Sequence, residues 1–172
     1  MEIGAYFGVG TVKLAIEARK RGKVVYVIDT FDPGQDYTPR DSGAAAGMYT
    51  SGLLRGRSQW EVYTRNTRHY AANIVTLRGD SREVAVPPAL KLCFAFIDGK
   101  HTPEYIRSDF DVAWSRIVPG GAIGFDDYGH ELPEAMQTID RLILENARDI
   151  SEVWTIKPKE IFLRKAARPR EI

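Results

Sequence analysis

Strand-like and helix-like segments alternate along the whole chain of 172 residues. Short β-branched and aromatic runs at 23–28 and 92–97 predict strands buried on both faces. Apolar residues at helical spacing predict helices at 11–21 and 103–114. This alternation is typical of an α/β fold with a largely parallel sheet, and no composition shift marks a second domain. We therefore expect residues 1–172 to form a single domain.

The remaining segments continue the pattern. We expect a short opening strand before Gly4, strands at 73–77 and 122–125, helices at 59–72 and 133–147, and a closing antiparallel pair at 152–156 and 161–163. Pro119-Gly120-Gly121 predicts a turn ahead of the strand at 122–125.

The composition excludes several classes of protein. Lys and Arg number 24 against 23 Asp and Glu, so no broad positive field would attract nucleic acid. No apolar run approaches the ~20 residues of a membrane helix, and we expect a cytoplasmic protein without a membrane partner. The single cysteine, Cys93, lies in an apolar run and is expected to be a small buried hydrophobe.

A glycine-rich loop opens the chain. Gly4, Gly8 and Gly10 follow the acidic Glu2 and precede a predicted helix, which is an arrangement that lets backbone N–H groups approach a ligand. Their spacing does not match the Gly-x-Gly-x-x-Gly fingerprint of dinucleotide-binding folds. Spacing alone leaves open that these glycines only make a tight strand-to-helix connection.

Asp29 ends the second predicted strand, near the ~20-residue offset at which dinucleotide folds place a ribose-binding acid. Its carboxylate could accept hydrogen bonds from both ribose hydroxyls. The alternative is a solvated acid at a strand end.

The segment 32–58 interrupts the rhythm with many prolines and glycines. Long irregular segments in compact domains are usually functional or disordered. We expect a candidate substrate lid in which Tyr37, Arg40 and Tyr49 meet a polar substrate, with a passive loop as the alternative.

Three acidic residues follow two strands that end at the same edge of the predicted sheet. Asp98 follows one strand and Asp126-Asp127 the other, and ligands of open α/β sheets bind at this edge. Hard oxygen ligands suit Mg²⁺, or else Mn²⁺ or Ca²⁺. The alternative is that these acids cap loops. His101 lies three residues after Asp98 and is a candidate general base, with Lys100 and His130 as competitors.

The ordered motifs resemble those of class I S-adenosylmethionine-dependent methyltransferases. The similarity covers roughly residues 1–145 and is greatest to the group with macrocin O-methyltransferases, related sugar O-methyltransferases and cephalosporin-hydroxylase-like proteins. The motifs are Glu2-x-Gly4-x-x-x-Gly8, Val27-Ile28-Asp29, Gly79-Asp80-Ser81, Phe96 to His101, Pro119-Gly120-Gly121 and Phe125-Asp126-Asp127.

This resemblance implies a Rossmann-like methyltransferase fold, with a mostly parallel seven-stranded sheet, helices on both faces and a shortened N-terminus. It implies that Glu2, Gly4 and Gly8 border the methionine part of S-adenosylmethionine, Asp29 its ribose, and Asp80 with Ser81 its adenine. It also makes the fourth and fifth strands neighbours, so that Asp98, Asp126 and Asp127 hold a divalent metal while His101 and Asp98 are catalytic.

The implied reaction is metal-assisted O-methylation of a hydroxyl on a sugar or small secondary metabolite. A small-molecule acceptor is the expected partner, and assembly into a homo-oligomer is left open. Two alternatives stand beside it: hydroxylase-like chemistry on the same fold, and a binding subunit without catalysis.

Overall fold

The computed structural model of the protein describes residues 1–32, 34, 54–156 and 159–167. They form two compact units, which we call the N-terminal unit (Glu2–Val84) and the C-terminal unit (Ala85–Ile172, together with Met1). The predicted lid at 32–58, with Tyr37, Arg40 and Tyr49, lies largely outside the described residues.

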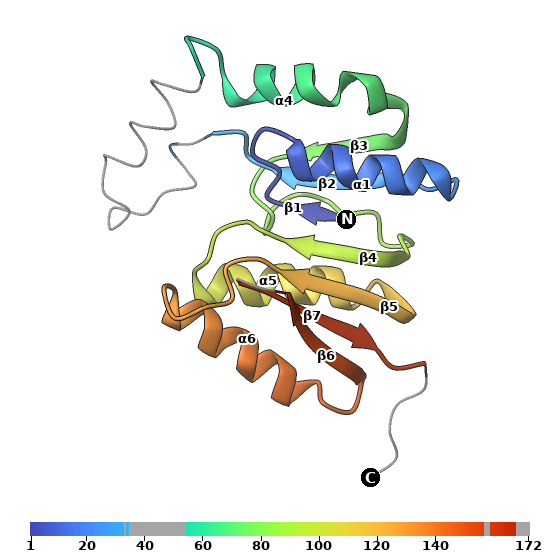
Figure 1. The fold of residues 1–172 in the computed structure, drawn as a ribbon, viewed down its shortest axis with the longest axis vertical. Coiled ribbons are helices and arrows are strands. Elements are labelled where there is room, and N and C mark those ends of the chain that lie inside the picture. The colour runs from blue at the N-terminus through green and yellow to red at the C-terminus, as the bar shows by residue number, and fades with distance from the viewer. Residues whose placement is uncertain (33, 35–53, 157–158, 168–172) are drawn as a thin grey trace. The chain divides into compact units, whose positions relative to one another are not determined.

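The N-terminal unit holds three parallel strands in the order β3-β2-β1 (Figure 1). Strand β2 is central, since Val27 pairs with Glu2 on one side and with Thr76 on the other. The elements along the chain are β1 (Glu2–Ile3), α1 (Val9–Lys20), β2 (Val25–Asp29), α4 (Gln59–Thr67), the 3-10 helix η2 (Arg68–Asn73) and β3 (Ile74–Arg78).

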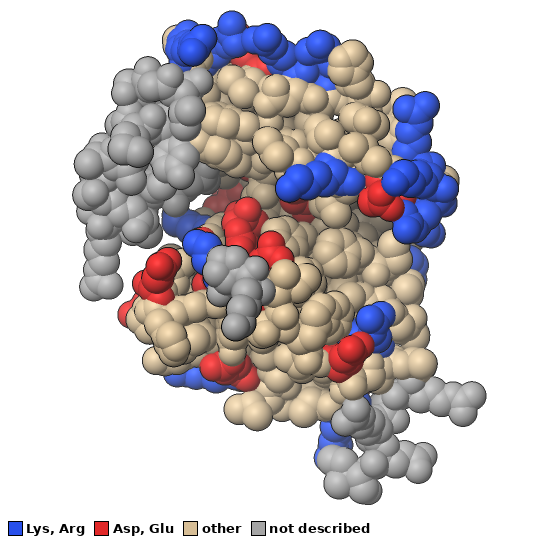
Figure 2. Space-filling model, in the orientation of Figure 1, with Lys and Arg blue, Asp and Glu red and all other residues tan. Residues whose placement is uncertain are grey.

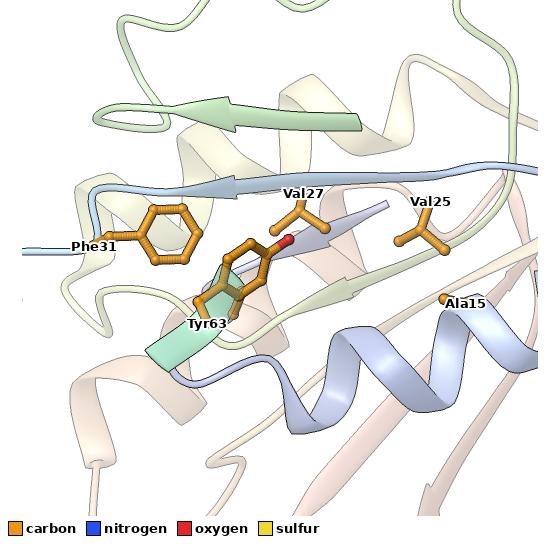
Figure 3. Packing of buried hydrophobic residues seen from close by; sticks show 6 residues of the cluster. Ala15, Val25, Val27, Phe31 and Tyr63 are labelled. Carbon is orange, nitrogen blue, oxygen red and sulfur yellow. The ribbon is translucent and has the colours of Figure 1, made fainter. Parts of the chain in front are cut away.

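A buried cluster ties α1 and α4 to β2. Figure 3 shows Ala15 of α1 beside Val25, and the ring of Tyr63 from α4 between Phe31 and Val27. The rings of Phe31 and Tyr63 lie 4.5 Å apart, and Tyr63 is only 2% exposed. The partly buried Trp60 packs against this cluster. The cluster therefore fixes α4 next to the segment that follows β2.

The C-terminal unit holds four strands in the order β4-β5-β7-β6. Strands β4 and β5 are parallel, whereas β7 is antiparallel to both of its neighbours, so the predicted closing antiparallel pair is confirmed. The elements are β4 (Leu92–Ile97), α5 (Pro103–Trp114), β5 (Ile117–Phe125), α6 (Pro133–Glu145), β6 (Ile150–Ile156) and β7 (Glu160–Lys165).

Two predictions fail at the beginning of β4 and β5. The residues of the predicted turn, Pro119-Gly120-Gly121, lie within β5. Leu92 of β4 pairs with Ile117 and Phe94 pairs with Ala122, so β5 has extra residues between these two pairs. The extra residues bulge from the strand, and Gly120 adopts a φ of 80°. Cys93 lies at this irregularity and is exposed, so its predicted burial is wrong.

The helix predicted at 59–72 divides after Thr67 into α4 and η2. Among the described residues, no helix combines the length and apolar character needed to cross a bilayer. The seven described strands are mostly parallel, as expected.

Candidate active site

The glycine loop between β1 and α1 depends on left-handed backbone at two of its three predicted glycines. Gly4 has a φ of 86° and Gly8 a φ of 82°. At Gly8 a Cβ atom would also lie 2.8 Å from Cγ2 of Thr67 and 2.9 Å from the ring of Tyr63. Glycine at position 8 therefore serves the close packing of α4 as well as the turn.

The Asp29 carboxylate fixes this loop by hydrogen bonds to its backbone. Its Oδ2 accepts the backbone N–H groups of Ala5 at 2.7 Å and Tyr6 at 2.9 Å, while its Oδ1 accepts that of Phe31 at 2.6 Å. Burial raises the pKa of the Asp29 carboxyl, and the three N–H donors oppose this rise. The predicted ribose acid is thus a structural anchor of the loop, with part of its hydrogen-bonding capacity already used.

Glu2 is buried beneath the first turn of α1. It is 3% exposed, accepts a hydrogen bond from the Thr11 hydroxyl and lies where a side chain on Gly10 would collide with it. Burial raises the pKa of Glu2 to about 7. The predicted methionine-bordering acid therefore supports the start of α1 from within the N-terminal unit.

Side-chain amides of helix α4 donate hydrogen bonds to carbonyl oxygens of the same loop. The Asn66 amide donates to Phe7 O at 2.9 Å, and the Gln59 amide donates to Tyr6 O at 3.3 Å. Neither residue was predicted to contribute to the site, since both are more than 50 positions from the loop and belong to no motif. Asp29 therefore holds N–H groups of the loop, while α4 holds two of its carbonyl oxygens.

The first turn of α1 begins at this fixed loop. Gly8 is the N-cap residue and provides no side-chain cap, so the backbone N–H groups at the helix N-terminus remain to serve an anionic group. A carboxylate such as that of a methionine moiety fits this donor set.

Asp80 and Ser81 follow β3 in a tight turn. Asp80 accepts the N–H of Arg82 at 2.9 Å and forms an ion pair of 3.3 Å with its guanidinium. Ser81 is half-buried in the same turn. The turn itself is anchored to β2, because Gly79 N–H donates to the carbonyl oxygen of Asp29.

In the C-terminal unit, three predicted residues converge beyond β4 and β5. One side-chain ligand atom each from Asp98, His101 and Asp127 lies within 4.8 Å of the other two. In Figure 2 acidic side chains, in red, gather on the left of this unit, at the end toward which the arrows of β4 and β5 point in Figure 1. This group mixes two carboxylates and an imidazole, a donor set that suits a divalent cation.

Asp126 is outside this group, although it was predicted to be a metal ligand beside Asp127. Its backbone N–H donates to the carbonyl oxygen of Ile97 and so extends the β4–β5 pairing. The next residue, Asp127, has a φ of 55°, which turns its side chain into a different direction. Of the competing bases, His130 is exposed, and Lys100 lies 5.0 Å from the ring of Tyr105.

Asp127 has two partners. Its Oδ2 lies 3.5 Å from Nε2 of His101, and its Oδ1 lies 2.5 Å from the ammonium of Lys159. This hydrogen bond with Asp127 raises the pKa of Lys159. Lys159 was not predicted, because it immediately precedes β7 and carries no motif.

The loop that bears Asp127 is held by Tyr128. The Tyr128 N–H donates to the carbonyl oxygen of Lys159 at 2.8 Å, and its hydroxyl donates to Asp140 of α6 at 2.8 Å. Burial, followed by the contact with Asp140, raises the pKa of Tyr128 to about 12.

A family model described as a methyltransferase domain matches residues 1–128. The chain belongs to this methyltransferase family. The match covers both the glycine loop and the Asp98–His101–Asp127 group, and the predicted resemblance to class I S-adenosylmethionine-dependent methyltransferases is confirmed.

Solved structures agree on the fold. The methyltransferase is similar to the O-methyltransferase NovP, with a TM-score of 0.71 and 21% identity over 96% of this chain and 70% of that one. It is also similar to CalS11, described as a TDP-rhamnose 3′-O-methyltransferase, with a TM-score of 0.59 and 19% identity over 95% and 70%. A third similar structure, SMU.1697c of Streptococcus mutans in complex with SAH, has a TM-score of 0.61 and 12% identity over 95% and 87%.

Proposed function

We propose that this methyltransferase transfers the methyl group of S-adenosylmethionine to a hydroxyl group of a sugar or small secondary metabolite, with a divalent cation at its acidic group. The observation that carries the proposal is the convergence of ligand atoms from Asp98, His101 and Asp127 within 4.8 Å. An imidazole beside two carboxylates can both accept a proton and adjoin a cation.

The cofactor belongs to the N-terminal unit in this proposal. Its methionine carboxylate would accept N–H groups at the start of α1, where Gly4 and Gly8 keep the backbone open. Asp29 would contact the ribose through the remaining lone pair of Oδ1, and Asp80 with Ser81 would border the adenine. This assignment is supported by the hydrogen bonds that already fix the loop: Asp29 accepts two of its N–H groups, and Asn66 donates to one of its carbonyl oxygens.

His101 would accept the proton of the acceptor hydroxyl. As the oxygen forms a bond to the methyl carbon, the bond between that carbon and the sulfonium sulfur breaks and leaves S-adenosylhomocysteine. The resulting imidazolium would be stabilised by Asp127, whose Oδ2 lies 3.5 Å from Nε2 of His101. The oxygen, methyl carbon and sulfur must be in line, so positioning of the acceptor is the other contribution of the protein.

Asp98 and Asp127 would hold the cation, with His101 alongside and water completing the shell. The ligand atoms of the group lie within 4.8 Å of one another, near enough for one small cation to contact both carboxylates. A cation here would supply Lewis acidity that lowers the pKa of the acceptor hydroxyl. Asp126, predicted as a third ligand, would need its side chain to turn toward the group.

The proposed acceptor class rests on the relatives. NovP is described as an O-methyltransferase and CalS11 as acting on TDP-rhamnose at the 3′-oxygen. A nucleotide-linked deoxysugar is therefore the first acceptor to test.

The test is methyl transfer from radiolabelled S-adenosylmethionine to a panel of nucleotide-linked sugars. We expect His101→Ala and Asp98→Asn each to reduce turnover by roughly 100-fold or more. His130→Ala is the matched control, because this exposed histidine lies outside the group and should leave turnover unchanged. Unchanged turnover in both site variants would remove the catalytic assignment, and full activity in EDTA would remove only the metal.

A further inference from the structure

Lys159 already places a positive charge at the group in which the proposed cation would bind. Its Nζ lies 2.5 Å from Oδ1 of Asp127, while Oδ2 of the same carboxylate faces His101 at 3.5 Å. One oxygen of Asp127 is therefore paired with an ammonium, and the other lies near an imidazole.

This ion pair joins two segments whose backbones are fixed side by side. The Tyr128 N–H donates to the carbonyl oxygen of Lys159, so the residue after Asp127 is bonded directly to the backbone that carries the ammonium. Tyr128 is held in turn by Asp140 of α6. These bonds keep the side chains of Lys159 and Asp127 within reach of each other.

A divalent cation held by Asp98 and Asp127, with His101 alongside, would lie next to this ammonium. The two positive charges would repel each other at short range, and they would compete for the carboxylate of Asp127. Release of the ammonium is feasible, because the Lys159 side chain is 44% exposed and can extend into water.

Resting on the proposed function, we propose that Lys159 is a built-in counter-cation of Asp127 that competes with the divalent metal, so that metal binds only when the ammonium leaves the carboxylate. The lysine offsets the charge of Asp127 in the metal-free protein. It thereby sets the metal concentration at which the group becomes occupied.

The experiment is a calorimetric titration of the full chain with Mn²⁺ alone and Mg²⁺ alone, in the absence of cofactor and acceptor. Lys159→Met should increase the affinity for both ions about tenfold, whereas Lys159→Arg, which keeps the charge, should leave affinity near that of the wild type. Lys91→Met is the matched control for removal of a positive charge from the same unit, since Lys91 is exposed and precedes β4 at the opposite end from Asp98.

Each outcome decides the proposal. The proposal is supported if Lys159→Met binds the ions more tightly and Lys159→Arg and Lys91→Met do not. This holds even if binding to the wild type is too weak to measure. Unchanged or weaker binding in Lys159→Met overturns it, as does absence of binding in every variant, and circular dichroism confirms that each variant is folded. Methyl transfer in EDTA is measured separately, so failure of the counter-cation proposal is distinguishable from failure of the proposed function.

Discussion

The carboxylate of Asp29 accepts the backbone N–H of Ala5 at 2.7 Å, although the two residues are 24 positions apart in the chain. The same oxygen also holds the N–H of Tyr6, which has a strained φ of 50°. One buried acid at the end of β2 therefore determines the shape of the loop that is proposed to meet the cofactor.

Replacement of Asp29 by Asn should destabilise the N-terminal unit. An amide offers one acceptor oxygen where the carboxylate offers two, so at least one buried N–H group loses its partner, at a cost of about 1–3 kcal/mol. Urea denaturation measures the change. Asp32→Asn alters an exposed acid on the same segment and should change stability by less than about 0.5 kcal/mol. Equal losses in the two variants would contradict the anchoring role.

Glu2 makes stability depend on pH. Because burial raises its pKa from 4.5 to about 7, the folded protein binds a proton that the unfolded chain releases between these values. The contribution of Glu2 is therefore fully present below pH 4.5 and is lost as the pH rises to 7, by about 3 kcal/mol. Glu2→Gln should remove this slope in urea denaturation at a series of pH values. Glu83→Gln, at an exposed acid of the same unit, should preserve it, and a persistent slope in Glu2→Gln would show that another group is responsible.

Gly8→Ala should destabilise the protein by about 2–4 kcal/mol, because the new Cβ would combine left-handed strain with collisions against Thr67 and Tyr63. The matched control is Gly22→Ala. Gly22 also has a positive φ of 62°, but open space surrounds it, so this variant should lose only about 1 kcal/mol. Thermal denaturation of the two variants separates strain from packing, and similar losses would mean that the contact with α4 is unimportant.

Asn66→Ala should weaken binding of S-adenosylhomocysteine roughly fivefold, because loss of one hydrogen bond of about 1 kcal/mol frees the loop carbonyl of Phe7. Asn73→Ala removes a longer bond, of 3.5 Å, to Lys23 at the other end of α1 and should leave affinity unchanged. Isothermal titration calorimetry gives both affinities. If the two substitutions have the same effect, the hold of α4 on the loop does not contribute to cofactor binding.

Local patterns predicted most of the fold. The strand at 92–97 and the helix at 103–114 were found with the observed bounds, since each has a clear apolar pattern and a turn or proline at its boundary. At Pro119-Gly120-Gly121 the turn signal was misleading. Pairing with β4 continues on both sides of these residues, so tertiary contacts converted an expected turn into a bulge.

The sequence predicted which residues lie at the site, but not which side chains contact each other there. The acids at strand ends predicted Asp98 and the Asp126-Asp127 pair, but nothing in the sequence indicates that Asp127, with its positive φ, is the one near His101. No spacing rule connects Asp127 with Lys159, because the two meet through the backbone bond between Tyr128 and Lys159. The contact of Asn66 with Phe7 likewise depends on how α4 packs over the loop.

We propose that this methyltransferase moves a methyl group from S-adenosylmethionine to an oxygen atom. Incubation with nucleotide-linked sugars, followed by mass spectrometry of the products and NMR assignment of the methylated atom, tests it most directly. We expect a sugar that gains one methyl group on a hydroxyl oxygen, with one S-adenosylhomocysteine released per product. A methyl group on nitrogen or carbon, or no transfer to any hydroxyl acceptor by protein that binds S-adenosylmethionine in calorimetry, would contradict it.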